Sequence, residues 1–142
     1  MFDTVYEPGT LEAVAYRDGL ELGRFALRTP GPERVLCLEK DYEGEELVFL
    51  TASITDGEGR TVISADELLT AQVEGAQLLG FGSGDPKPLL NYNEGRCKTW
   101  KGRAQLILKK TGPGPIRLTL CSESGKTAEL SIEIEQQATP AC

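Results

Sequence analysis

Apolar residues recur at every second position along most of this chain, and this alternation limits the fold more than any other feature. A strand places successive side chains on opposite faces, so such a series predicts a β-strand with one buried face. Helical spacing of apolar residues is missing. Two packed antiparallel sheets would bury the alternating faces, so the sequence predicts an all-β sandwich. The clearest series are Val48, Leu50, Ala52 and Ile54; Leu69, Ala71 and Val73; Leu106 and Leu108; Ile116, Leu118 and Leu120; and Ala128, Leu130, Ile132 and Ile134.

The first 31 residues are expected to form a separate β-hairpin. An alternating run over 10–16 leads into Asp18-Gly19, a dipeptide typical of tight hairpin turns, and a second run follows over 22–27. Thr29-Pro30-Gly31-Pro32 comes next, and its prolines lack the N–H groups that strand pairing needs. We therefore expect a hairpin over 1–31, a sandwich domain over 32–136 and a disordered tail over 137–142.

Charge and hydropathy exclude several classes of partner. The chain has 22 acidic and 15 basic residues, a formal net charge of −7, and the basic residues are scattered. This balance argues against nucleic acid and against anionic membrane surfaces. The longest apolar run is far too short to cross a bilayer. The first residues lack the basic and apolar regions of a signal peptide, so the compartment stays open, with the cytoplasm favoured.

The cysteines and the missing histidine limit the chemistry. Cys37, Cys97, Cys121 and Cys142 include no CxxC pair, which excludes the usual zinc spacing. Sparse cysteines in a domain of this size favour free thiols, although two disulfides remain open. The chain has no histidine, which excludes catalytic triads. No metal, cofactor or catalytic residue is expected.

Carboxylates remain the one available catalytic group, because glycosidases need only two acids across a sugar. The densest acidic cluster is predicted to be a solvated turn between strands. A calcium site is the alternative, although the ordered ligand spacing of a calcium loop is missing. The cluster consists of Glu39, Asp41, Glu43, Glu45 and Glu46.

One long irregular stretch, residues 82–102, is either functional or an interface. The preceding Gly80-Phe81-Gly82-Ser83-Gly84 continues into Asp85-Pro86 rather than a helix, so it indicates a sharp turn and not a phosphate loop. An aromatic face with amide neighbours can hold a sugar ring, whereas the alternative is that the tryptophan covers the edge of the core. The candidate sugar or interdomain contacts are Asn91, Tyr92, Trp100 and Arg103.

Two parts of the chain resemble a known family. Residues 6–19 (YEPGTLEAVAYRDG) and 22–29 (LGRFALRT) are similar to the closing hairpin of the β-sandwich that follows the catalytic barrel in many bacterial β-galactosidases of glycoside hydrolase family 2. Residues 47–56, 80–86 (GFGSGDP) and 100–108 (WKGRAQLIL) resemble the next domain of those enzymes.

This resemblance implies an immunoglobulin-like antiparallel β-sandwich with an extra N-terminal β-hairpin. It also implies a parent that is a retaining exo-glycosidase for terminal β-galactosides, with two glutamates in a separate barrel. No position here matches the catalytic glutamate motifs of the family. The expected partners are the barrel and the neighbouring β-sandwich domains of the parent.

The hairpin would be severed from its own sheet, which exposes strand edges and an apolar face. Leu11, Ala13, Phe25 and Leu27 should therefore dock on the sandwich or on another chain, and self-association through residues 10–28 is expected.

Three functions remain open at this point. The leading hypothesis is a non-catalytic accessory domain that braces or shapes the barrel and supports oligomerisation. The first alternative is a carbohydrate-binding module that uses Trp100 and Tyr92. The second is a cell-surface spacer, because immunoglobulin-like domains recur in many surface proteins.

Overall fold

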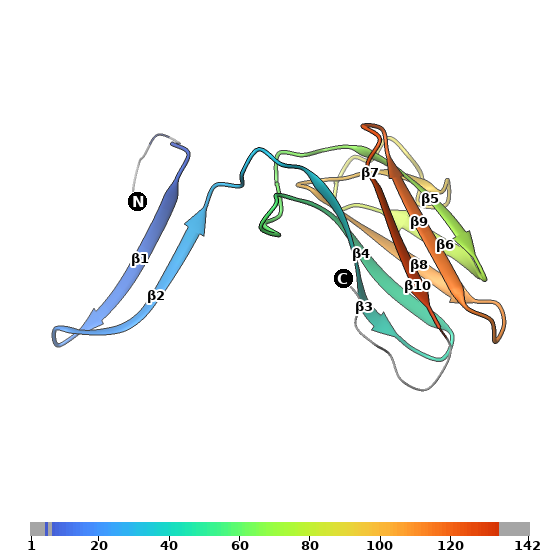
Figure 1. The fold of residues 1–142 in the computed structure, drawn as a ribbon, viewed down its shortest axis with the longest axis horizontal. Coiled ribbons are helices and arrows are strands. Elements are labelled where there is room, and N and C mark those ends of the chain that lie inside the picture. Colours follow the sequence, from blue (N-terminus) through green and yellow to red (C-terminus); the bar gives the residue numbers. More distant parts are fainter. Residues whose placement is uncertain (1–4, 6, 134–142) are drawn as a thin grey trace. The chain divides into compact units, whose positions relative to one another are not determined.

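The computed structural model describes Val5 and residues 7–133, so the predicted tail over 137–142 lies outside the described residues. All elements of this part are strands, numbered β1 to β10 (Figure 1). The chain divides into two compact units, of which the first ends at Gly31 and the second begins at Pro32. The predicted all-β class is confirmed.

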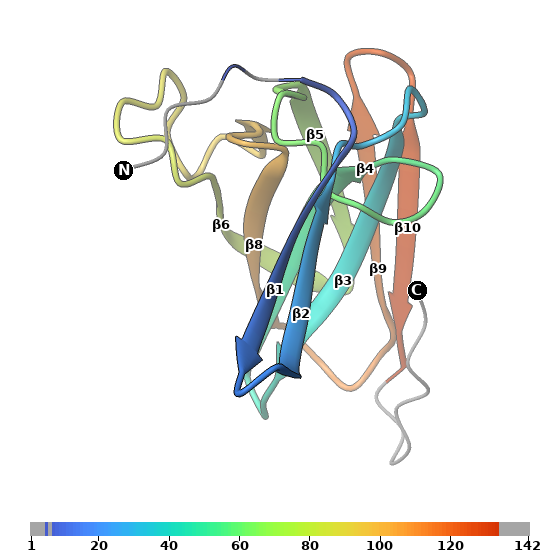
Figure 2. The same cartoon turned by 90° about the vertical axis from the view of Figure 1, so that its left-hand side faces the viewer.

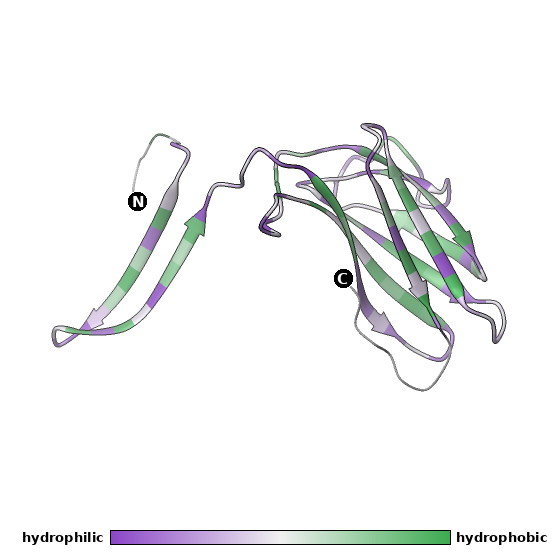
Figure 3. Ribbon diagram, viewed as in Figure 1, coloured by the Kyte–Doolittle hydropathy of each residue, from purple (hydrophilic) through white to green (hydrophobic). Residues whose placement is uncertain are grey.

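The first unit is an antiparallel hairpin of β1 (Thr10–Arg17) and β2 (Leu20–Arg28). Its turn has positive φ at both central residues, 52° at Asp18 and 78° at Gly19, which is the type I′ geometry that matches strand twist. At the open end, the Thr29 N–H donates to the Gly9 carbonyl at 2.8 Å. Both strands carry hydrophobic and hydrophilic stretches (Figure 3).

The two faces of the hairpin differ in chemistry. Cross-strand register places Leu11 opposite Leu27 and Ala13 opposite Phe25, so these four side chains share one apolar face. The other face carries Arg24, which forms ion pairs with Glu12 and Glu21. Phe25 is 66% exposed and Leu11 is 71% exposed, so nothing within the hairpin covers the apolar face.

The second unit is a sandwich of two four-stranded antiparallel sheets. Figure 2 shows β6 and β8 in one layer and β9 and β10 in the other. The first sheet has the order β3 (Val35–Glu43), β4 (Leu47–Thr55), β8 (Arg103–Lys110), β6 (Ala76–Gly82). The second has the order β10 (Thr127–Ile132), β9 (Ile116–Ser122), β5 (Leu68–Glu74), β7 (Arg96–Lys98).

This strand order is that of an immunoglobulin domain. The strands of the sandwich, apart from β7, can be lettered A to G in chain order. The first sheet, β3-β4-β8-β6, then has the order A-B-E-D, and the strands β10-β9-β5 of the second sheet have the order G-F-C. The predicted immunoglobulin-like sandwich with an extra N-terminal hairpin is therefore confirmed. The short β7 is an addition that pairs with β5 through Arg96, Cys97 and Lys98. The stretch 82–102 is thus not wholly irregular, because part of it extends the second sheet.

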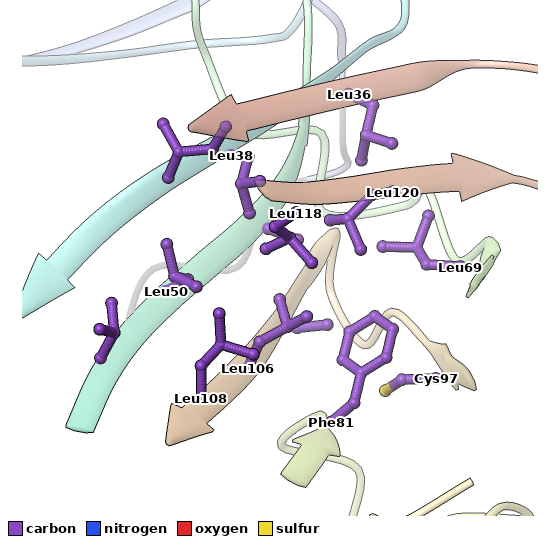
Figure 4. Packing of buried hydrophobic residues seen from close by; sticks show 14 of the residues in the cluster. Leu36, Leu38, Leu50, Leu69, Phe81, Cys97, Leu106, Leu108, Leu118 and Leu120 are labelled. Carbon is purple, nitrogen blue, oxygen red and sulfur yellow. The ribbon is translucent and has the colours of Figure 1, made fainter. Parts of the chain in front are cut away.

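The core lies between the two sheets. Leucines from both sheets point into this space (Figure 4), and fully burying one such side chain contributes about 1.5–3 kcal/mol. The largest fully buried side chains are Phe81, Leu50, Ile54, Leu69, Leu106, Leu108, Ile116, Leu118, Leu120 and Val48. Every buried side-chain nitrogen or oxygen in the described ranges has a hydrogen-bond partner. Within the described residues, the alternation seen in the sequence therefore identifies the core-facing positions correctly, and Ile134 lies outside them.

The acidic cluster is placed differently from the expectation. β3 continues to Glu43, so Glu39, Asp41 and Glu43 lie on a strand rather than in a turn. The register of β3 against β4 shifts between Lys40 and Tyr42, and this bulge accommodates Asp41. Only Gly44 to Glu46 remain between the strands.

Candidate functional site

A groove of about 970 Å³ lies on the outer face of the first sheet, over β6 and β8. Along β8, Ala104, Leu106 and Leu108 are buried in the core, so Arg103, Gln105 and Ile107 point to the opposite face. Register brings Gln105 beside Gly82 and Ile107 beside Gly80 on β6. The floor of the groove is therefore made of β8 side chains next to bare glycine backbone.

The glycines of the Gly-Phe-Gly-Ser-Gly motif provide space rather than a sharp turn. None of Gly80, Gly82 and Gly84 has a positive φ. A Cβ at Gly82 would lie 2.2 Å from Cδ1 of Tyr92, and a Cβ at Gly84 would lie 3.1 Å from Cε3 of Trp100. A Cβ at Gly80 would meet no atom within 4 Å. Two glycines thus admit aromatic rings, and the third keeps the groove open.

Trp100 is held at the rim by a two-residue turn. Lys101 and Gly102 have φ of 51° and 75°, which is type I′ geometry, and the Trp100 N–H donates to the Arg103 carbonyl at 3.0 Å. The Gly102 carbonyl accepts a hydrogen bond from the Ile54 N–H at 2.8 Å. Trp100 remains 36% exposed and is not part of the buried core cluster.

Three of the four candidate contact residues converge on the groove. Tyr92, 56% exposed, lines it together with Trp100 and Arg103, and its carbonyl accepts a hydrogen bond from the Phe81 N–H at 2.7 Å. Asn91 does not line the groove, and its side-chain amide donates to Glu94 Oε1 at 3.0 Å. Sequence reasoning missed Gly80 and Gln105. A glycine inside a strand marks a close backbone approach or a gap, so Gly80 itself was the signal that could have pointed to the groove.

The charges at the groove have one sign. Lys101 and Arg103 line it, and no carboxylate does so among the residues that the structure describes. The Lys101 Nζ lies 4.5 Å from the centroid of the Trp100 ring, and Arg103 Nη2 lies 3.4 Å from Thr61 Oγ1. The groove is therefore cationic on a chain whose net charge is −7.

A second hollow of about 600 Å³ lies along the stretch that contains β7, and Tyr92 and Trp100 line it as well. Three carboxylates line it, and one of them is Asp66. The other two, Asp85 and Glu123, accept backbone hydrogen bonds from Lys87 and Leu68 at 2.8 and 3.2 Å. These two carboxylates hold the local backbone in place.

Two half-buried carboxylates elsewhere, Glu43 and Glu67, form ion pairs with lysines. Glu43 accepts hydrogen bonds from Lys40 at 2.6 Å and Lys110 at 2.9 Å, and Lys40 is the main reason that the pKa of Glu43 is lowered. Burial alone would raise the pKa of Glu67, but hydrogen bonds led by Lys126 outweigh it and the pKa is lowered. Over the described ranges, no group of three His, Cys, Asp or Glu side chains could hold a metal ion.

The cysteines that the structure describes, Cys37, Cys97 and Cys121, are free thiols. Burial raises the pKa of the Cys97 thiol, which makes the reactive thiolate scarcer. Cys142 lies outside the described residues. In this part of the chain, no helix is long and apolar enough to cross a membrane.

Comparison with known proteins decides the family. The family model of the glycoside hydrolase family 2 C-terminal domain 5 matches residues 39–131. The chain belongs to this family. This family 2 domain is 27% identical over 138 residues to a β-galactosidase of Bacteroides ovatus, and the match covers 92% of this chain but 16% of that protein.

Solved structures agree with this assignment. A glycosyl hydrolase family 2 member from Bacteroides cellulosilyticus has a TM-score of 0.85 and 27% identity, over 92% of this chain and 19% of that chain. A β-glycosidase from Bacteroides vulgatus has a TM-score of 0.76 at 23% identity, over 90% of this chain and 18% of that chain, and shows the fold alone. The match with the Bacteroides cellulosilyticus structure leaves 8% of this chain uncovered, which is fewer residues than the first unit contains. This match therefore includes part of the hairpin unit.

Proposed function

We propose that this family 2 domain is a non-catalytic accessory part of a larger glycoside hydrolase, where it braces or shapes the catalytic barrel. The observation that carries this role is the share of each relative that the chain matches: 16% of the Bacteroides ovatus protein and 19% of the Bacteroides cellulosilyticus chain. A segment of that size, made of a hairpin and a sandwich, leaves most of the relative's length for the reaction.

The proposed activity of the parent is hydrolysis of terminal β-galactosides with retention of configuration. Two findings support this activity: the curated relative is a β-galactosidase, and this chain belongs to a C-terminal domain family of glycoside hydrolase family 2. Retaining glycosidases need two carboxyl groups about 5–5.5 Å apart across the sugar. Of the carboxylates described above, Glu43, Glu67 and Asp85 bind lysines or a backbone amide instead, which supports placing the reaction outside this chain.

The hairpin is proposed to join this domain to its surroundings. Its apolar face, formed by Leu11, Ala13, Phe25 and Leu27, has no cover within its own unit. An exposed apolar sheet face of this kind usually belongs to an interface. In the intact enzyme we expect the preceding β-sandwich domain to bury it, and in the isolated chain a second copy.

The accessory role is tested by deletion in the full-length parent. We expect the isolated chain to leave 4-nitrophenyl β-galactoside intact. We expect the parent without residues 32–133 to lose thermal stability and kcat/KM, because the barrel loses a packing surface. Hydrolysis by the isolated chain would contradict the proposal. Unchanged kinetics, oligomeric state and melting temperature in the truncated parent would contradict it equally.

A further inference from the structure

We infer that the groove over β6 and β8 binds an oligosaccharide that carries carboxylate groups, such as a chain of uronic acids. The inference rests on the groove alone and goes beyond the accessory role. The groove has the size of a small-ligand site, because its volume of about 970 Å³ falls within the usual range for such sites. A protein partner would more often need a larger and flatter surface.

The aromatic side chains supply a surface for sugar rings. Tyr92 and Trp100 stand at the groove with 56% and 36% of their surfaces exposed, although both are large and apolar. The C–H faces of pyranose rings pack on such aromatic faces, and hydroxyl groups at the ring edge need hydrogen-bond partners. Gln105 and Thr51 lie opposite each other on neighbouring strands and line the same groove. The Gln105 amide can donate and accept, whereas the Thr51 hydroxyl already donates to Asp41 Oδ2 and offers its oxygen as an acceptor.

The glycines leave room for the ring. Gly80 pairs with Ile107, and the space where its side chain would stand is empty to at least 4 Å. The Tyr92 and Trp100 rings pack against Gly82 and Gly84, so they cover the floor next to these two glycines and leave the part at Gly80 open. A sugar can therefore approach the β6 backbone closely.

The charge of the groove selects an anionic ligand. Within the described residues, Arg103 and Lys101 form no ion pair; Arg103 donates to Thr61, and Lys101 lies over the Trp100 ring. The planar guanidinium of Arg103 fits a carboxylate with two parallel hydrogen bonds, and hydrogen bonds to charged groups are the stronger ones. A uronate offers this carboxylate on the ring that stacks.

The test uses Trp100 as the reporter, because it is the sole tryptophan of the chain. The emission of the full chain is titrated with trigalacturonate, with neutral galactotriose and with inorganic phosphate. We expect a saturable shift with trigalacturonate at millimolar concentration or below. We expect binding of the neutral sugar to be about tenfold weaker, the loss typical of a charge-assisted hydrogen bond.

Two pairs of variants separate binding from folding, with affinity measured by calorimetry. Gly80→Val fills the open floor and should abolish binding, whereas Gly112→Val, also at a site with no atom within 4 Å of the added Cβ, should not. Arg103→Gln should weaken binding about tenfold, whereas Arg117→Gln on β9 should leave it unchanged. Circular dichroism confirms that each variant is folded.

Several outcomes would overturn the assignment. If Trp100 emission does not shift up to about 10 mM trigalacturonate, the groove does not bind this sugar and would instead be a contact surface for another domain of the parent. Equal shifts with galactotriose would remove the role of Arg103, and an equal response to phosphate would make the groove a general anion site. Unaltered binding by Gly80→Val would place the ligand elsewhere. None of these results bears on the deletion experiment in the parent.

Discussion

At the scale of single residues, Gly102 positions Trp100 through two separate effects. Its φ of 75° lies in the left-handed region, and an added Cβ would lie 2.4 Å from the Val62 carbonyl oxygen. We therefore expect Gly102→Ala to lower the free energy of unfolding by about 1–3 kcal/mol and to change Trp100 emission. Urea denaturation followed by fluorescence measures both.

The matched control is Gly112→Ala, at a position without close neighbours or a positive φ. It should change the free energy of unfolding by less than about 0.5 kcal/mol. Equal destabilisation by the two substitutions would show that the contact with Val62 is not what requires glycine at 102.

At the scale of elements, the hairpin is an edge-exposed unit with one apolar and one charged face. We expect the isolated chain to self-associate through the apolar face, and Phe25→Glu to abolish this association, because a buried unpaired carboxylate is costly. Thr10→Glu is the control, since Thr10 lies opposite Arg28 on the charged face. Sedimentation velocity over a concentration series measures the state. A wild-type chain that stays monomeric throughout the series would refute the interface.

At the scale of the whole molecule, stability should depend on pH through two carboxylates. The pKa values of Glu43 and Glu67 are both lowered from the ordinary value of 4.5. A lowered folded-state pKa stabilises the fold at pH values above the unfolded-state pKa, and this stabilisation is lost as the pH falls through the folded-state pKa. We expect the free energy of unfolding to be level near neutral pH and to fall below pH 4.5.

Chemical denaturation at a series of pH values measures this effect. Glu43→Gln combined with Glu67→Gln should reduce the fall in the free energy of unfolding at acid pH, the acid limb of the profile, because neither side chain then titrates. Glu129→Gln, on the exposed side of β10, should leave the limb as it is. An acid limb that is unaltered in the double variant would mean that other groups control acid unfolding.

The strands and their buried faces could be predicted from the sequence, because alternation is a local property of each segment. Leu50, Leu106 and Leu118 belong to alternating series, and all are fully buried. The acidic cluster was predicted to be a turn because a dense group of charged residues is typical of loops, whereas β3 continues to Glu43, which pairs with the buried Val48. β7 was missed because three residues are too short to show a period.

The candidate site was predictable only as a set of residue types. Tyr92 and Trp100 stood out as aromatic side chains in one long stretch, with Asn91 as an amide neighbour, and Arg103 follows directly after that stretch. The structure separates Asn91 from the groove and adds Gln105 and Gly80. Membership of one segment does not determine which side chains face the same way.

By itself, the sequence determined the all-β class, the hairpin and the sandwich, because periodicity and turn residues act over a few neighbouring positions. Only the tertiary structure decided which strands pair, and hence that Gly80 meets Ile107 and Gly82 meets Gln105. Pairing between distant segments depends on how two whole sheets fill one core. The groove exists because that pairing places glycines beside β8, on the face that the core leaves exposed.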